Sequence, residues 1–374
     1  MKTLRLIMCI LFFFCCTTGV YAAADTVVDM NIFHVMGLLD DGEELSSSYM
    51  MGSQLGVSFK SPNSSNVRGD VAISMVDSYS GTLWDPRFSI DRAYLRVRFP
   101  KFRITAGKTR IGWGDGAMFN AADLLFGSTN TDVTLTDKEL RTATRWLTSA
   151  TYPLGPFSFL EALVIAPVGP DFALRNTSFG GRYYTTIASM KVEAGGAYRA
   201  DSSKTNDTGR VLSPYIALQG NFGPDWYVST TVNVAYPTEE IAEELEDSWI
   251  VSGGLLHIMN VGWQSTLSFR LEALVKPFGD WETSAEKNYG LYLYPEISYA
   301  PDDVWNFSIR SVVSPIDASA NITLGGSWNV MQGLSINGYA TIYAGENTDT
   351  FSWKQIDTQT PSGLSVMLGA SWVY

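Results

Sequence analysis

The chain ends on the stretch LSVMLGASWVY, Leu364 to Tyr374, in which an apolar or aromatic side chain occupies every second position. Because neighbouring side chains of a strand point to opposite faces, one face of this segment is apolar and carries Trp372 and Tyr374. The other face holds mostly small or polar residues, such as Ser365 and Ser371. The pattern predicts a strand with one face in lipid and the other in water.

Segments with the same alternation recur at intervals of roughly 20 residues along the chain. Clear examples lie at 54–60, 92–99, 226–234, 267–273 and 334–342. A soluble β-sandwich would show the same periodicity, so the alternation alone leaves the class of β protein open.

The connections favour a membrane barrel. Short turns are expected at Pro62-Asn63, Pro100-Lys101, Gly155-Pro156, Gly223-Pro224, Asn260-Val261-Gly262, Pro301-Asp302 and Gln332-Gly333, and at the weakly marked Thr186–Ser189. Longer polar connections are expected at 38–47, 77–88, 112–141, 166–177, 200–211, 236–248, 276–288 and 344–362, and a shorter one at 313–319. Short and long connections alternate, as they do in barrels with short periplasmic turns and long outer loops.

The predicted fold is therefore all-β: a transmembrane antiparallel up-and-down β-barrel of about 16–18 strands. The first strand begins near Thr26, which leaves no room for a plug domain, and a barrel of this size without a plug encloses an aqueous channel. Five tryptophans fall near expected strand ends, where aromatic residues form girdles at the membrane interfaces. They are Trp226, Trp263, Trp305, Trp328 and Trp372.

The first 24 residues have the features of a cleaved secretory signal peptide. A short basic start at 2–5 precedes the apolar run Leu6–Phe14, and small residues at 22–24 offer a cleavage site. The competing interpretation is a lipoprotein acylated at Cys15 or Cys16, but the bulky Phe14 disfavours it. We expect residues 25–374 to form a single barrel.

Composition limits the chemistry. The mean hydropathy is only +0.02 although 45% of the residues are hydrophobic, which suits strands that face lipid on one side. The net charge of −12 makes nucleic acid an improbable partner. All three cysteines lie in the first 16 residues and there are two histidines, so neither a disulfide scaffold, a metal site nor a cofactor is expected.

Two segments resemble known outer-membrane proteins. The terminal strand ending in Trp372-Val373-Tyr374 resembles the last strand of bacterial outer-membrane barrels, which the barrel-insertion machinery recognises. The segment Gly107–Phe126, with Trp113-Gly114-Asp115-Gly116 followed by an Asn and an Asp, resembles a segment of porin-like outer-membrane families. The resemblance implies a location in the outer membrane, contact with its lipid, and a homotrimer.

One predicted strand carries several arginines on the same face. Arg92, Arg96 and Arg98 are separated by even numbers of residues, so their side chains point to one face of the strand, with Tyr94 between them. An arginine in the lipid face near the midplane costs roughly 2–4 kcal/mol, so this face must line the lumen. The same basic surface is extended by the neighbouring candidates Arg68, Arg103, Arg145 and Arg182. It is interpreted either as an anion-attracting wall of a pore or as a structural set of ion pairs.

The connection 113–141 is the longest and is expected to fold into the lumen as a constriction. Its carboxylates would face the arginines: Asp115 and Asp123 are the main candidates, followed by Asp132, Asp137 and Glu139. Lys108 and Arg110 break the parity of the preceding strand, which places them at its outer end or past a bulge.

We therefore expect a porin-like channel for passive diffusion of small hydrophilic solutes or ions. An enzyme is not expected, because neither His34 nor His257 has a nucleophile motif nearby. The acidic stretch 239–247 is interpreted as a solvated loop, with weak cation binding as the alternative. The alternatives to a porin are an outer-membrane transporter for hydrophobic substrates and a non-conducting surface or adhesin barrel.

Overall fold

A computed structural model describes most of the chain. The described residues are 25–40, 45–61, 66–80, 83–131, 133–137, 140–167, 176–200, 210–235, 249–284, 287–354 and 363–374. The expected signal peptide and the acidic stretch 239–247 lie outside these residues. Within the described part of the chain, no helix is long and apolar enough to cross a membrane.

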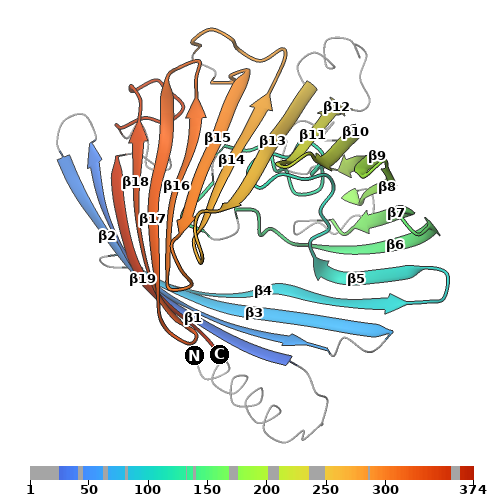
Figure 1. Ribbon diagram of the computed structural model, residues 1–374, viewed down its shortest axis with the longest axis horizontal. Coiled ribbons are helices and arrows are strands. Elements are labelled where there is room, and N and C mark those ends of the chain that lie inside the picture. The colour runs from blue at the N-terminus through green and yellow to red at the C-terminus, as the bar shows by residue number, and fades with distance from the viewer. Residues whose placement is uncertain are drawn as a thin grey trace, which may run out of the picture.

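The chain forms one antiparallel sheet that closes on itself (Figure 1). Its strands are β1 (Asp25–Asp40), β2 (Leu45–Lys60), β3 (Val67–Ser80), β4 (Leu83–Arg98), β5 (Arg103–Thr109), β6 (Arg145–Gly155), β7 (Ser158–Ile165), β8 (Ser178–Ile187), β9 (Met190–Ala200), β10 (Arg210–Asn221), β11 (Asp225–Val232), β12 (Val234–Ala235), β13 (Trp249–Asn260), β14 (Thr266–Val275), β15 (Leu291–Ala300), β16 (Trp305–Ser314), β17 (Ser319–Met331), β18 (Leu334–Ala344) and β19 (Leu364–Val373). Strands β11 and β12 both pair with β10, one after the other, so together they make a single strand of the wall. The barrel therefore has 18 strands, as predicted.

Closure is made by the first and last strands. Met30 lies opposite Trp372 and Leu38 opposite Leu364, and two backbone hydrogen bonds of 2.8 Å join Val28 to Tyr374. With both edges paired, no row of backbone N–H and C=O groups is left to face hydrocarbon, where water is absent.

The two faces of the wall differ as the alternation predicts. Large apolar residues such as Phe88, Leu255 and Leu368 are exposed on the membrane-facing surface. On β6 through β9 this surface is hollowed into a groove of about 640 Å³, lined mainly by small and aromatic residues. The inner face carries polar side chains such as Ser213, Ser252 and Glu272, which are buried beneath the segment that enters the lumen.

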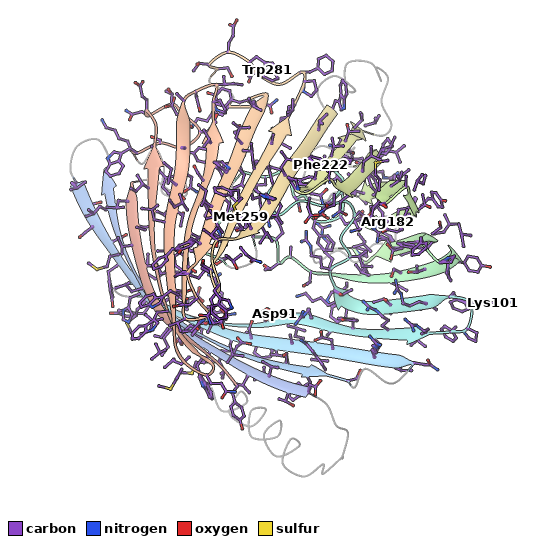
Figure 2. All side chains as sticks on the ribbon, viewed as in Figure 1. Asp91, Lys101, Arg182, Phe222, Met259 and Trp281 are labelled. Atoms are coloured by element: carbon purple, nitrogen blue, oxygen red, sulfur yellow. The ribbon has the colours of Figure 1, made fainter. Side chains whose placement is uncertain are left out.

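Short turns and longer loops lie at opposite ends of the barrel, here called the turn end and the loop end. Figure 2 labels one residue of each, Lys101 in the β4–β5 turn and Trp281 in the β14–β15 loop. The five predicted girdle tryptophans gather at the turn end, where Trp305 and Trp328 stack at 5.4 Å. The weakly marked turn is confirmed: Ala188 and Ser189 adopt positive φ values and reverse the chain between β8 and β9.

One connection was predicted wrongly. Strand β3 continues to Ser80 and β4 begins at Leu83, so strand occupies most of the 77–88 stretch that was expected to be a loop. The same effect shortens the 38–47 connection, because β1 extends to Asp40 and β2 begins at Leu45. These strand ends are polar on both faces in places, so they lack the apolar alternation by which a strand is recognised.

Candidate functional site

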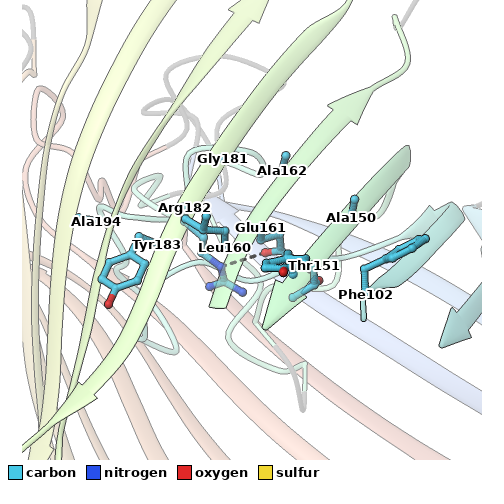
Figure 3. A pocket seen from close by; sticks show the side chains of 11 residues that line it. Phe102, Ala150, Thr151, Leu160, Glu161, Ala162, Gly181, Arg182, Tyr183 and Ala194 are labelled. Atoms are coloured by element: carbon cyan, nitrogen blue, oxygen red, sulfur yellow. Dashed lines mark hydrogen bonds and ion pairs between the residues drawn. The ribbon is translucent and has the colours of Figure 1, made fainter. Parts of the chain in front are cut away.

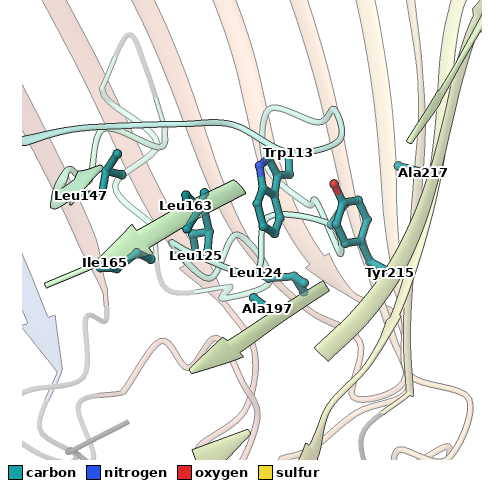
Figure 4. Close-up of a cluster of buried hydrophobic side chains, with 10 residues drawn as sticks. Trp113, Leu124, Leu125, Leu147, Leu163, Ile165, Ala197, Tyr215 and Ala217 are labelled. Carbon is teal, nitrogen blue, oxygen red and sulfur yellow. The ribbon is translucent and has the colours of Figure 1, made fainter. Parts of the chain in front are cut away.

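The segment between β5 and β6, residues 110–144, turns inward and packs against the inner wall (Figure 1). In one cluster, Trp113 stacks on Tyr215 of β10 with ring centroids 5.5 Å apart. Leu124 and Leu125 of the same segment pack there against Leu163 of β7 (Figure 4). All five side chains are almost fully buried, so the segment is fixed to the β6–β10 wall by apolar contact.

A second cluster fixes the segment to the other side of the barrel. Met118 and Phe119 are fully buried among inward-facing residues of β14–β16, including Leu274 and Tyr294. Phe351, from the β18–β19 loop, joins the same cluster. The 110–144 segment therefore spans the interior and contacts walls that lie far apart in the sequence.

Charged side chains anchor the start of the segment. Arg182 of β8 donates a 2.9 Å hydrogen bond to Glu161 (Figure 3). It also donates a 2.9 Å bond to Glu193 and a 3.1 Å bond to the carbonyl of Gly112. Glu161 also accepts from the Trp113 indole at 3.2 Å. Glu193 accepts from the backbone N–H of residue 114 at 3.0 Å. One buried arginine and two carboxylates on the wall thus hold three consecutive residues of the segment.

The middle of the segment is held through its backbone. The carboxylate of Glu272, on β14, accepts the N–H groups of Ala117, Met118 and Phe119 at 2.9, 2.9 and 2.8 Å. The Tyr227 hydroxyl donates to the Phe119 carbonyl at 2.7 Å. Three successive N–H groups directed at one carboxylate form an anion-binding nest.

Arginines hold the remainder of the segment. Arg141 donates to the carbonyls of Met118 and Asn130 at 2.6 and 2.8 Å. Arg310 of β16 donates to the carbonyls of Leu135 and Asp137 at 3.1 and 2.7 Å. These bonds satisfy carbonyl groups that no strand pairs with.

The glycines of the Trp-Gly-x-Gly motif are required by the backbone. Gly114 has φ of +65° and Gly116 of +133°, a region that residues with a Cβ rarely adopt. A Cβ on Gly114 would also lie 2.6 Å from that of Ala122. The two glycines therefore allow backbone conformations between Trp113 and Ala117 that other residues would adopt only with strain.

A cavity of about 460 Å³ lies between this segment and the β14–β16 wall. Four arginines and three carboxylates line it: Arg110, Arg141, Arg270, Arg310, Asp115, Asp123 and Glu296. On the wall, Glu296 pairs with Arg310 at 3.0 Å and with Arg270 at 3.4 Å. The cavity is therefore a polar, strongly charged compartment within the lumen, suited to hydrated or charged solutes.

On the segment itself, Arg110 pairs with Asp123, which also accepts from Ser128. Burial raises the pKa of the Asp123 carboxyl, although the Arg110 guanidinium opposes the rise. Burial likewise lowers the pKa of the Arg141 guanidinium. Both shifts arise because the segment lies inside the barrel and is shielded from bulk water.

The arginines predicted to share one face form a separate basic wall. Arg68 on β3 lies directly opposite Arg96 on β4, and the Arg96 guanidinium lies 5.7 Å from the centre of the Tyr94 ring. Arg92 is 4.0 Å from Asp70, the limit of an ion pair. We call the set Arg68, Arg92, Tyr94, Arg96, Arg98 and Arg103 the basic wall; it lies on β3–β5.

The other predicted residues are distributed differently. Asp115 and Asp123 line the cavity. Asp137 lies beside Arg310 rather than beside the basic wall. Arg145 is the exposed first residue of β6, opposite Thr109. Asp132 and Glu139 lie outside the described residues.

No protein-family model and no curated protein matches this sequence. Solved structures do match its fold. OccAB3 of Acinetobacter baumannii superposes with a TM-score of 0.53 at 11% identity, covering 94% of this chain and 99% of that one. OccK7 of Pseudomonas aeruginosa gives 0.52 at 8% identity, with coverages of 95% and 99%. OccAB4 of Acinetobacter baumannii gives 0.53 at 9%, with coverages of 94% and 98%. The chain has the fold of the outer-membrane porins.

Sequence reasoning missed much of the charge within this porin fold. Arg141, Arg270, Glu272, Glu296 and Arg310 were not singled out, although all five contact or face the inward segment. The available signal was parity, because Arg270 and Glu272 occupy the polar face of an alternating strand. Parity assigns them to the lumen but says nothing of their partners.

The two histidines of the porin fold lie on its membrane-facing surface. His34 is opposite the exposed Leu368, and His257 is opposite the exposed Phe269. Residues directly opposite on antiparallel strands point to the same face. Both imidazoles are therefore separated by the wall from the charged cavity.

Proposed function

We propose that this chain is a porin-like channel of the outer membrane, through which small hydrophilic solutes or ions diffuse passively. The observation that carries the proposal is the charged cavity of about 460 Å³ between the inward segment and the β14–β16 wall. A closed barrel with an apolar outer face is anchored in lipid, and its polar interior provides the aqueous path.

In this proposal the residues 113–141 form the constriction, and two sets of charges select the solute. The basic wall attracts anions toward the lumen, and the cavity adds carboxylates, Asp115, Asp123 and Glu296, that lie among four arginines and attract cations. Opposed rings of charge set ion preference in pores. Arg145, exposed at the loop end, extends the positive potential toward the entrance.

The proposal includes the route to the membrane. Residues 1–24 are removed as a signal peptide, and the barrel-insertion machinery recognises the terminal strand β19 with Trp372 and Tyr374. The assembled form is a homotrimer. The signal peptide is supported by the composition of residues 2–24, and the other two points are supported by the sequence resemblance described above.

The test is single-channel recording of the refolded protein in a planar bilayer under a salt gradient. Folding is checked first by the heat-sensitive shift of the band on a gel. Stable conductance steps are expected, and their reversal potential reports the net selectivity of the lumen. A folded barrel that gives no steps at any voltage would refute the proposal and favour a non-conducting surface barrel.

A further inference from the structure

We propose that Glu272 is a positioning residue that latches the constriction in place, so that its carboxylate determines the conductance of the channel. The inference rests on the proposed function, because it holds that one wall residue, Glu272, determines the width of the proposed channel. The latched element is the stretch 117–119, whose three N–H groups all bind the Glu272 carboxylate.

The burial of Glu272 makes this contact a strong one. The residue is 1% exposed, and its two oxygens accept three backbone hydrogen bonds besides a 3.3 Å contact with Arg270. Hydrogen bonds to an ionised acceptor are shorter and stronger than neutral ones, and more so where water is excluded. Removing the carboxylate would leave three N–H groups inside the barrel without this acceptor.

Packing alone does not fix the position of this stretch. Met118 and Phe119 are buried in the second apolar cluster, but apolar contact is non-directional and tolerates small displacements. Bonds from several strands supply the direction: Glu272 from β14, Tyr227 from β11 and Ser252 from β13, which accepts the Ala121 N–H at 2.8 Å. Glu272 makes three of these five bonds from the wall, and Arg141, within the segment itself, adds a bond to the Met118 carbonyl.

The neighbouring backbone is suited to motion once the latch is released. Gly114 and Gly116, both with positive φ, lie directly before the latched stretch and can act as pivots. The stretch contributes Ala117 to the lining of the charged cavity, and Asn120, the next residue after it, lines the cavity too. A displacement at 117–119 therefore changes the cavity itself, and with it the current.

Thiol labelling measures the latch without relying on conductance. In a full-length background with Cys9, Cys15 and Cys16 replaced by serine, Met118→Cys introduces a single buried thiol in the latched stretch. Its labelling rate by a water-soluble reagent is compared with and without Glu272→Gln. Leu163→Cys, buried on β7 against the 124–125 part of the segment, reports any loosening of the barrel or the segment beyond the latched stretch. Glu296→Gln removes another lumen carboxylate that does not bind the stretch and serves as the matched charge control.

We expect Glu272→Gln to accelerate labelling at position 118 about tenfold or more, as loss of charge-assisted bonds predicts, and to leave position 163 unchanged. Glu296→Gln should leave both rates unchanged. In single-channel recordings Glu272→Gln should give larger or flickering steps.

Three results would overturn the latch: no acceleration at position 118, equal acceleration at position 163, or the same acceleration with Glu296→Gln. If Glu272→Gln fails to fold, Tyr227→Phe removes one bond to the stretch and Ser252→Ala removes the bond to the nearby Ala121, and each should give a smaller acceleration at position 118. A folded wild type that does not conduct, together with acceleration in Glu272→Gln, would refute the channel but retain the latch as a structural anchor.

Discussion

Replacing Arg182 with methionine should strongly destabilise the barrel, because two buried carboxylates depend on one guanidinium. The Arg182 side chain is 11% exposed, and those of Glu161 and Glu193 are 5% and 13% exposed. Both pairs have N–O distances of 2.9 Å. Methionine keeps the apolar length of the side chain but removes every donor.

The magnitude follows from this burial. Removing one partner of a buried ion pair costs about 3–5 kcal/mol, because the other charge stays buried and uncompensated. Two carboxylates lose their partner here, so the upper part of that range is expected. The triple variant with Glu161→Gln and Glu193→Gln as well should recover much of the loss, since neutral amides need no counter-charge.

The assay is equilibrium unfolding in urea of the barrel refolded into vesicles, followed by tryptophan fluorescence. Arg87→Met is the control, because the Arg87–Asp85 pair is largely exposed and should leave the midpoint unchanged. A loss below about 1 kcal/mol for Arg182→Met would contradict the reasoning, since that is the value of an exposed pair. A triple variant no more stable than the single one would contradict it too.

Three further predictions concern selectivity, packing and pH. Changing Arg92, Arg96 and Arg98 together to glutamate should move the reversal potential toward cation preference, and an unchanged potential would remove the basic wall from selection. Trp113→Ala should cost about 3–5 kcal/mol in urea unfolding, since the side chain is fully buried and stacked, and Trp146→Ala on the exposed face is its control. Burial alone would raise the pKa of Asp317, but hydrogen bonds led by the Thr350 N–H outweigh it and hold the pKa below 3.8. The resulting stability is present at neutral pH and lost as pH falls through that lowered value, so the difference between wild type and Asp317→Asn should shrink on acidification below the ordinary carboxyl range; a pH-independent difference would argue against it.

Much of the barrel was predictable because side-chain alternation in strands and the preferences of turn residues act over only a few neighbouring residues. The parity of Arg92, Tyr94, Arg96 and Arg98 follows from the two-residue repeat, and β4 places them on one face as expected. Gly223-Pro224 and Pro301-Asp302 mark turns because their backbone preferences act within four residues. The length and polarity of 112–141 predicted a segment separate from the wall.

The site depends on contacts that are distant in sequence. Glu272 binds N–H groups 153 to 155 residues earlier in the chain, and Arg310 binds carbonyls 173 to 175 residues away. Which wall faces which part of the segment is decided by closure of the barrel and by the path of the segment, and neither leaves a local pattern. Sequence reasoning therefore named the arginines of β4 and also Arg182, but it missed Glu161, Glu193, Glu272 and Arg310, which hold the segment.

The Glu272 contact involves main-chain atoms, so it places little demand on the identity of the residue it holds. Ala117 donates its N–H to Glu272 while it lines the charged cavity. Any amino acid except proline supplies the same donor. The side chain at position 117 can thus be changed without removing the main-chain bond to Glu272, which makes it the position at which the lining of the cavity can be altered while the path of the segment is kept.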